Sequence, residues 1–329
     1  MRILIAGLGS IGRRHLHNLQ AAGEHEILLY RTGRSSLPAD ELVGLPVYHD
    51  LQAALQQNPQ AVIVSNPTAL HLDVAIPAAE AGCHLLIEKP VSHSLERLDQ
   101  LERTAQRSGA RILVGYHFRQ HPGLRLVGEL LQNGAIGRPL SGRAHWGEYL
   151  PNWHPWEDYR QGYSARQDLG GGVILTLSHP LDYLHWICGE IEAGFAFTLR
   201  SGELEIDVED TAEILLRFKN DMLVSLHLDY NQRPSTHTLE IVGSKGTLKW
   251  DNASGAAALF QAGTDSWQEF PAPAGFERNQ LFAREIRHFL AVAQGEAEPI
   301  CTLEDGRLAL EWALLALRSA ATGQLVHRG

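Results

Sequence analysis

The sequence predicts an α/β protein with a doubly wound parallel sheet, followed by a second domain with a mainly antiparallel sheet. Three observations support this. Apolar runs alternate with helical stretches up to about residue 120, the hydrophobic period falls to two between about residues 192 and 251, and the chain has 329 residues. That length is too great for one typical core and suits two domains. We therefore expect domains over 1–120 and 121–329.

Five short apolar runs alternate with four helical stretches in the first part. Several runs are continuously apolar, as expected for strands covered on both faces. Repeated strand–helix units of this kind form a doubly wound parallel sheet. The expected strands are Arg2–Ala6, Ile27–Tyr30, Ala61–Ser65, His84–Glu88 and Arg111–Gly115, and the expected helices are Arg13–Ala22, Leu51–Gln57, Leu70–Ala81 and Leu95–Ser108.

The pattern changes after His121-Pro122-Gly123, where we expect a helix, an aromatic loop-like stretch, a glycine triplet and a second helix. Residues that alternate between apolar and polar then indicate neighbouring antiparallel strands, and two helices close the chain. The expected helices are Leu124–Gln132, Ser178–Ile187, Asn279–Gln294 and Leu303–Ala321, and the expected strands are Thr211–Lys219, Met222–Asp229, Leu239–Val242 and Thr247–Trp250.

Composition excludes several classes of function. The formal charge of −10 disfavours nucleic acid and anionic membranes as partners, because phosphate contacts need clustered Lys and Arg. No apolar run reaches the roughly 18 residues needed to cross a bilayer. Three distant cysteines argue against a disulfide framework and a cysteine-based zinc site, and favour a cytoplasmic protein. The histidines show no H-E-x-x-H spacing, so we predict no metal site.

A glycine-rich motif follows the first expected strand and opens a helix. Gly7-Leu8-Gly9-Ser10-Ile11-Gly12 has the G-x-G-x-x-G spacing of a dinucleotide-binding turn in a Rossmann domain. Gly7 permits the tight turn, Gly9 admits a pyrophosphate, and Gly12 lets helix and strand pack closely. Free N–H groups at the helix start, at Ser10 and Ile11, then bind the anion.

The end of the second expected strand indicates the cofactor. An NAD site usually has Asp or Glu there to bind the ribose 2′-hydroxyl. This chain instead has two arginines and two hydroxyls, which suit a 2′-phosphate or are solvated loop groups. We therefore predict NADP(H), with NAD(H) as the alternative. The residues concerned are Arg31, Thr32, Arg34 and Ser35.

Glu88-Lys89-Pro90 ends the strand predicted over His84–Glu88. Strand ends of a doubly wound sheet face the ligand crevice, so Lys89 is well placed to contact substrate or nicotinamide. The alternative is a surface lysine before a strand-breaking proline.

Taken together, the motifs resemble the Gfo/Idh/MocA family of oxidoreductases over almost the whole chain. They are the glycine-rich turn, Asn66-Pro67-Thr68 with His71, Glu88-Lys89-Pro90, Gly170-Gly171-Gly172 with His179 and Asp182, and residues 241–248. The resemblance implies a Rossmann domain and an α/β domain whose open sheet often forms a homo-oligomer interface, in a dimer or tetramer. It implies NAD- or NADP-dependent oxidation or reduction of sugars, cyclitols and related small molecules, without a metal.

The resemblance also implies residue roles. Lys89 matches the active-site lysine, and its peptide bond to Pro90 is expected to be cis. His179 matches the histidine assigned to proton transfer, and Asp182 the acid one helical turn beyond it. Relatives commonly have Asp four residues before that histidine, where this chain has Leu175. We expect Asn66, Pro67, His71, Glu88, Lys89 and Pro90 to line the cofactor site.

The pair Lys89 and His179 suits alcohol dehydrogenation. A histidine accepts the hydroxyl proton, and a lysine ammonium stabilises the developing alkoxide or polarises a carbonyl.

The stretch Arg143–Arg166 is rich in aromatic residues and suits stacking on a sugar, or alternatively a subunit contact. Its candidate substrate residues are Trp153, Trp156, Tyr159, Arg160 and Tyr163.

Two arginines are further candidates. Arg119 follows the last strand of the first part and is predicted to reach either the cofactor or the substrate. Arg233 ends a strand of the second domain and is predicted to line the substrate pocket. Three functions remain open: an NADP(H)-preferring sugar oxidoreductase, an NAD-linked cyclitol or sugar-acid dehydrogenase, and a non-catalytic dinucleotide-sensing regulator on the same scaffold.

Overall fold

The computed structural model describes residues 1–23, 25–32, 42 and 44–328, which form two compact units. The first unit draws on residues 1–117, 168–170 and 278–310, and the second on residues 118–167, 171–277 and the chain from 311 onward. The sequence analysis placed residues 278–310 in the second domain, whereas the structure places them in the first unit. Those residues follow the second unit's strands in the chain but pack with the first unit.

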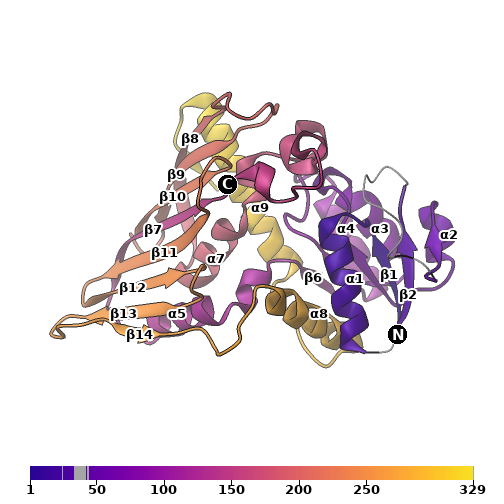
Figure 1. Ribbon diagram of the computed structural model, residues 1–329, viewed down its shortest axis with the longest axis horizontal. Helices are drawn as coiled ribbons and strands as arrows, with labels where there is room; N and C mark the ends of the chain where they lie inside the picture. Colours follow the sequence, from indigo (N-terminus) through magenta and orange to yellow (C-terminus); the bar gives the residue numbers. More distant parts are fainter. Residues whose placement is uncertain (24, 33–41, 43, 329) are drawn as a thin grey trace. The chain divides into compact units, whose positions relative to one another are not determined.

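A parallel sheet of six strands forms the centre of the first unit, in the order β3-β2-β1-β4-β5-β6 (Figure 1). Every side chain of the inner strand β4 is fully buried, which explains its continuous apolar run. Helix α1 packs with α8, and α3 packs with α4. The strands are β1 (Arg2–Ala6), β2 (Glu26–Tyr30), β3 (Val47–Tyr48), β4 (Ala61–Val64), β5 (His84–Ile87) and β6 (Ile112–Val114). The helices are α1 (Ser10–Ala22), α2 (Leu51–Leu55), α3 (His71–Glu80), α4 (Leu98–Ser108) and α8 (Asn279–Gln294).

A nine-stranded sheet forms the second unit, in the order β14-β13-β12-β11-β7-β10-β9-β8-β15. It is antiparallel except between β7 and β10, which run parallel. The strands are β7 (Pro139–Gly147), β8 (Ile191–Leu199), β9 (Thr211–Phe218), β10 (Leu223–Asp229), β11 (Thr236–Gly243), β12 (Gly246–Asp251), β13 (Ala257–Gln261), β14 (Gln268–Phe270) and β15 (Val326–His327). Its helices are α5 (Pro122–Gln132), α6 (Val173–Thr176) and α7 (His179–Cys188).

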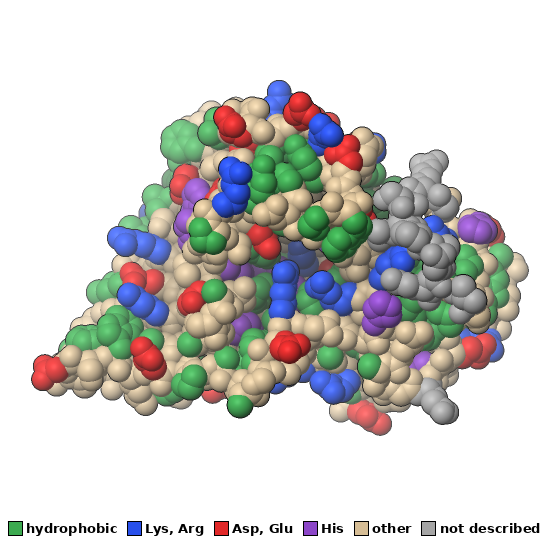
Figure 2. All heavy atoms as spheres, in the orientation of Figure 1, with side chains coloured by type: hydrophobic (Ala, Val, Ile, Leu, Met, Phe, Trp, Pro, Cys, Tyr) green, Lys and Arg blue, Asp and Glu red, His purple; other side chains and the backbone are tan. Residues whose placement is uncertain are grey.

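One face of this sheet packs against helices, and the other, here called the outer face, carries the polar residues. In β9, for example, Ile214 and Leu216 are buried, whereas Glu213, Leu215 and Arg217 are exposed. Helix α5 contacts β12 and β13, and Figure 1 shows α7 on the same side of the sheet. Both acidic and basic side chains appear on the face of the molecule in Figure 2.

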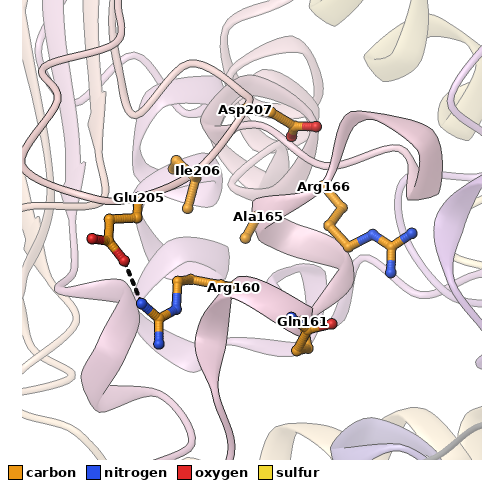
Figure 3. A pocket seen from close by; sticks show the side chains of 7 residues that line it. All are labelled: Arg160, Gln161, Ala165, Arg166, Glu205, Ile206 and Asp207. Atoms are coloured by element: carbon orange, nitrogen blue, oxygen red, sulfur yellow. Dashed lines mark hydrogen bonds and ion pairs between the residues drawn. The ribbon is translucent and has the colours of Figure 1, made fainter.

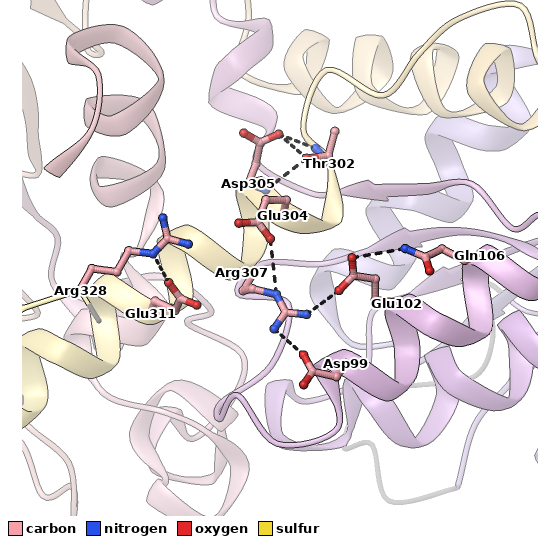
Figure 4. Close-up of polar contacts among 9 residues, drawn as sticks. All are labelled: Asp99, Glu102, Gln106, Thr302, Glu304, Asp305, Arg307, Glu311 and Arg328. Atoms are coloured by element: carbon pink, nitrogen blue, oxygen red, sulfur yellow. Dashed lines mark hydrogen bonds and ion pairs between the residues drawn. The ribbon is translucent and has the colours of Figure 1, made fainter.

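Helix α9 (Leu303–Thr322) begins in the first unit, where its start is defined by a reciprocal cap. Thr302 Oγ1 lies 3.2 Å from the backbone N–H of Asp305, whose carboxylate accepts the Thr302 N–H at 2.7 Å. One turn on, the Arg307 guanidinium bridges Asp99 at 2.8 Å and Glu102 at 3.0 Å, both on α4 (Figure 4). These bonds attach the first turns of α9 to the first unit.

The predicted fold class is confirmed, and several strands differ from the sequence-based expectation. Arg143–Gly147, expected to begin a loop, belongs to β7 at the centre of the larger sheet. Its Gly142 and Gly147 weaken the strand signal, because glycine disfavours strands in general. Strands β3, β13, β14 and β15 are short and were not predicted. The remaining short helices span Thr68–Leu70, His117–Gln120, Leu150–Asn152, Tyr159–Gln161, Tyr163–Ala165 and Gln167–Leu169.

All three cysteines are buried free thiols. Among the described residues, no helix is both long and apolar enough to span a membrane.

Candidate active site

The glycine-rich turn joins β1 to α1 and leaves room for a phosphate group. Gly7 has φ of 96°, and a Cβ there would lie 2.5 Å from the backbone nitrogen of Asn66. A Cβ on Gly12 would overlap the carbonyl oxygen of Gly7, whereas one on Gly9 would meet nothing within 4 Å. The turn is therefore closed on the protein side and open at Gly9. There the N-terminus of α1, beginning with Ser10 and Ile11, offers N–H groups to an anion.

The predicted 2′-phosphate residues are described only in part. Arg31 follows β2, and its backbone N–H donates to the carbonyl of Tyr48 at 3.0 Å. Its side chain is half-buried, and Thr32 beside it is exposed. Arg34 and Ser35 lie outside the described residues.

His71 links the ends of β4 and β5. Its Nδ1 lies 3.0 Å from the carbonyl oxygen of Pro90, and its Nε2 lies 2.9 Å from that of Asn66. Burial lowers the pKa of His71. Asn66 Nδ2 donates to the Leu70 carbonyl at 2.8 Å, and the peptide between Lys89 and Pro90 is cis, as expected. Residues 66–71 and 88–90 therefore lie together at the carboxyl edge of the parallel sheet.

Lys89 adjoins a buried cluster of titratable groups. Glu88 Oε1 lies 2.6 Å from His15 Nε2, while Glu88 Oε2 accepts the Lys89 backbone N–H at 3.2 Å. The half-buried Lys89 ammonium has its pKa lowered to about 8, chiefly by burial and then by the charge of Arg278, against the raising effect of Glu88. Burial alone would raise the pKa of Glu88, but the hydrogen bond from His15 and the nearby positive charges lower it overall.

Glu285 of α8 completes this cluster and was not predicted. Ligand atoms of His15, Glu88 and Glu285 lie within 4.8 Å of one another, and all three residues are buried. Burial, and then repulsion from Glu88, raises the pKa of Glu285 well above its ordinary value. A sequence signal exists, because Glu285 interrupts the apolar face that Leu281, Phe282, Ile286 and Phe289 form on α8.

In the second unit, His179 is the first residue of α7 and is 1% exposed. Aromatic rings surround its imidazole: the Phe118 ring lies edge-on at 4.8 Å and the Trp146 ring at 5.7 Å. Leu175, at the position where relatives commonly have Asp, is also buried. Position 175 therefore supplies no carboxylate to orient the imidazole.

Arg119 and Asp182 form a buried ion pair in the second unit. Arg119 Nε lies 3.1 Å from each carboxylate oxygen of Asp182, and Arg119 Nη2 lies 2.7 Å from Oδ1. The two side chains are only 5% and 1% exposed. The structure thus brings together a predicted cofactor residue and a predicted catalytic residue, and each charge neutralises the other.

The glycine triplet lets the chain fold closely around Glu209. A Cβ on Gly171 would overlap the Tyr163 carbonyl oxygen, and one on Gly172, where φ is 107°, would lie 2.5 Å from the Glu209 carboxylate. That carboxylate accepts the Ile174 N–H at 3.1 Å. Burial raises the pKa of Glu209 to about 7, partly offset by this backbone bond. Glu209 can therefore exchange a proton near neutral pH, and no sequence motif predicted it.

The predicted substrate residues differ in burial and in the side chains that they contact. The Trp153 ring lies edge-on to Tyr230 at 5.5 Å, Trp156 is 67% exposed, and the Arg233 guanidinium lies 4.0 Å over the Tyr149 ring. Tyr159 and Tyr163 are half-buried.

Arg160 instead lines an open cavity of about 450 Å³ with Gln161, Ala165, Arg166, Glu205, Ile206 and Asp207 (Figure 3). It forms ion pairs with Asp158 at 2.8 Å and with Glu205. Arg166 and Asp207 line the cavity on its other side in Figure 3. Polar and charged residues thus make up most of the lining of this cavity.

Comparisons with known proteins match both units. Residues 1–116 match the model of an oxidoreductase family with an NAD-binding Rossmann fold, and residues 124–249 match the model of the GFO/IDH/MocA C-terminal domain. The 1,5-anhydro-D-fructose reductase of Ensifer adhaerens is 28% identical over 89% of this chain and 83% of its own length. The myo-inositol 2-dehydrogenase of Thermotoga maritima is 27% identical over 94% and 93%.

Solved structures have the same fold. Levoglucosan dehydrogenase, in complex with NADH and levoglucosan, superposes with a TM-score of 0.88 and 19% identity over 99% of each chain. The WlbA dehydrogenase of Bordetella pertussis, in complex with NADH and UDP-GlcNAcA, superposes with a TM-score of 0.82 and 23% identity over 100% and 99%.

Proposed function

Because this chain belongs to the Gfo/Idh/MocA family of oxidoreductases, we propose that it transfers a hydride between NADP(H) and a hydroxyl or keto carbon of a sugar or sugar derivative. The observation that carries the proposal is Lys89, a lysine with a pKa of about 8 held at the carboxyl edge of the parallel sheet. At neutral pH its ammonium is ready to stabilise an alkoxide or polarise a carbonyl.

The first unit fits a bound dinucleotide. Gly7, Gly9 and Gly12, with the N-terminus of α1, would hold its pyrophosphate, and residues 66–71 and 88–90 would line the nicotinamide end. When bound, the nicotinamide accepts or donates the hydride. Arg31 would bind a 2′-phosphate through its guanidinium, together with the predicted Arg34.

His179 would take the hydroxyl proton during oxidation and return it during reduction. Asp182 lies in the first turn of the same helix, and its carboxylate is bound by Arg119. We therefore assign Asp182 a positioning role: the ion pair fixes the first turn of α7 and with it the imidazole of His179. Glu209 is a second group able to exchange a proton near pH 7.

The predicted substrate is a small sugar-like molecule. The stretch from Trp153 to Tyr163 supplies aromatic faces for stacking, and the open cavity beside Arg160 supplies polar groups for hydroxyls. Arg233, stacked on Tyr149, is a further candidate hydroxyl ligand. The named activities of the two sequence relatives, on an anhydro-sugar and on a cyclitol, support this substrate class.

We also propose that the protein works as a homo-oligomer in a reducing, cytoplasmic setting. Phe197, Leu199, Leu215 and Leu223 are between 47% and 66% exposed on the outer face, and patches of this kind mark subunit contacts. The buried free thiols suit a reducing compartment.

A turnover screen tests the proposed reaction. The protein is assayed with NADP⁺ and NAD⁺ against sugars, cyclitols and sugar acids, and with NADPH and NADH against the matching keto compounds. We expect turnover of a sugar or sugar derivative with a higher kcat/KM for the phosphorylated cofactor. Absence of turnover across all classes, despite tight dinucleotide binding, would contradict the proposal and favour a dinucleotide-sensing regulator.

An NAD-linked cyclitol or sugar-acid dehydrogenase is the second candidate. It is favoured by the NADH named in the complexes of both solved structures and by the inositol activity of the Thermotoga maritima relative. In the same screen this candidate predicts a preference for NAD⁺ and for cyclitols or sugar acids.

A further inference from the structure

Two histidines and two carboxylates meet on the outer face of the larger sheet. His145 on β7 and His227 on β10 are register partners across the parallel strand pair, and Glu213 on β9 is the register partner of His227 on its other side. Asp229 lies two residues beyond His227 and so points to the same face. These residues are far apart in sequence, and the order β7-β10-β9 brings them together.

The donor atoms of this cluster are already close. Ligand atoms of His145, His227 and Asp229 lie within 4.8 Å of one another. His227 Nε2 lies 2.9 Å from Asp229 Oδ2, and the two imidazole rings lie 4.5 Å apart between centroids. Four ligands arranged tetrahedrally around Zn²⁺ at its usual bond lengths lie about 3.4 Å apart. Shifts of about 1 Å in side-chain position would therefore close the three donors around one ion.

The surrounding groups orient these donors as in zinc sites. His227 directs its other nitrogen, Nδ1, to Glu213 Oε1 at 2.6 Å, which is the carboxylate–histidine arrangement that fixes a metal-binding imidazole. Asp229 Oδ1 accepts the backbone N–H groups of Asn231 at 2.7 Å and Gln232 at 2.6 Å. That leaves Asp229 Oδ2 facing His227.

The neighbouring strand β7 also leaves space for the Asp229 carboxylate. A Cβ on Gly147, the register partner of Asp229 on β7, would overlap Asp229 Oδ2 and the side chain of Gln232. Gln232 Oε1 lies 2.5 Å from His145 Nε2, so an amide oxygen lies beside the three donors. Glycine at 147 is thus required by a carboxylate that is itself only 8% exposed.

We propose that His145, His227 and Asp229 bind a Zn²⁺-class divalent ion, with Glu213 orienting His227 and the Gln232 amide or a water as the fourth ligand. Two neutral imidazoles and two carboxylates carry a charge of −2, which a divalent ion balances. The site lies in the second unit, on the sheet face opposite the helices, and its role is independent of the hydride-transfer chemistry.

Metal binding at this site displaces a proton. A divalent ion binds an imidazole through a nitrogen that carries no proton, so protons compete with the ion for His227. The charged or titratable groups that face it are Glu213 on β9, His145 on β7 and Asp229 on its own strand. Since the ion needs neutral imidazoles, apparent affinity should fall as the pH is lowered.

Cobalt titration of the full chain, after treatment with a chelator, tests the site. We expect one Co²⁺ per chain, the intense visible absorption of a four-coordinate complex, displacement by Zn²⁺, and proton release that is largest at mildly acidic pH. His227→Ala and His145→Ala should abolish the absorption. Glu213→Gln, which keeps all three ligands, should weaken binding by roughly 10–100-fold.

The matched control is His327→Ala, which removes an exposed imidazole from β15 of the same sheet and should bind Co²⁺ as the unchanged protein does. Circular dichroism checks that each variant is folded, and Glu213→Gln keeps the test valid if a histidine variant is not. Equal binding by the His227→Ala, Glu213→Gln and control proteins would overturn the proposal. So would the faint absorption of a six-coordinate complex.

Discussion

Removing the carboxylate of Asp182 should destabilise the second unit strongly, because the buried Arg119 guanidinium loses the carboxylate that it binds through three short contacts. The pair has three nitrogen–oxygen contacts of 2.7–3.1 Å, and its side chains are 5% and 1% exposed. Breaking one partner of such a pair costs about 3–5 kcal/mol, whereas replacing both by apolar groups of similar size is often neutral or stabilising. We therefore expect Asp182→Leu and Arg119→Met to destabilise singly, and the double variant to recover most of the loss.

Urea unfolding followed by tryptophan fluorescence measures this effect selectively. All seven tryptophans lie in the ranges of the second unit, so their emission reports that unit even if the first unfolds separately. Comparing the unchanged, single and double variants gives a coupling free energy for the pair. Asp182→Asn serves as the control that keeps the shape and removes the charge, and it should cost nearly as much as Asp182→Leu.

Single variants that lose less than about 1 kcal/mol would refute this reasoning, as would a double variant no more stable than the worse single one. The catalytic readout then separates the roles of Asp182. A positioning role predicts that kcat falls while the dependence of kcat on pH keeps its shape. Loss of one limb of that pH profile would instead identify Asp182 as a proton-transfer group.

Three further predictions concern the first unit. Glu285→Gln should stabilise the protein at pH 7 by on the order of 1–3 kcal/mol. The raised pKa of Glu285 means that the unchanged protein loses stability as pH rises above about 4.5, so thermal melts followed by circular dichroism should show a gain that disappears in acid. The kcat/KM should fall as pH rises through about 8, where Lys89 loses its proton, and a profile flat to pH 10 would contradict that role. Arg31→Ala with Arg34→Ala should remove most of any preference for NADPH over NADH, on the order of 2–4 kcal/mol by calorimetry, and equal affinities in the unchanged protein would contradict the NADP(H) prediction.

The first unit was largely predictable because its signals are local. A continuous apolar run such as Ala61–Val64 identifies a strand covered on both faces, and a glycine-rich turn directly after β1 identifies the phosphate-binding loop. Helix α8 shows the limit of such reasoning. The helical spacing of its apolar residues is clear in the sequence. Its packing on α1, however, is a contact between segments far apart in the chain, and no local sequence pattern indicates it.

The residues of the candidate sites also fall into those that the sequence predicts and those that only the structure shows. Lys89 and His179 stand in motifs, whereas Glu209 and Glu285 are single acids whose chemistry arises from burial after folding. Asp182 and Arg119 were predicted to have separate roles, and only the structure shows that they bind each other. His145 and His227 lie 82 positions apart, and the parallel pairing of β7 with β10 in an otherwise antiparallel sheet makes them neighbours.

The central claim is the proposal that Lys89 and His179 assist hydride transfer between nicotinamide and a sugar-like alcohol, Lys89 by stabilising the alkoxide and His179 by taking the hydroxyl proton. Its most direct test is kcat, measured by nicotinamide absorbance with the best substrate of the screen, for Lys89→Ala and His179→Ala beside the exposed controls Lys219→Ala and His327→Ala. We expect each active-site variant to lose roughly 100-fold or more in kcat, the His179→Ala protein to bind cofactor normally, and both controls to keep full activity. A His179→Ala or Lys89→Ala protein with near-normal kcat would contradict the claim.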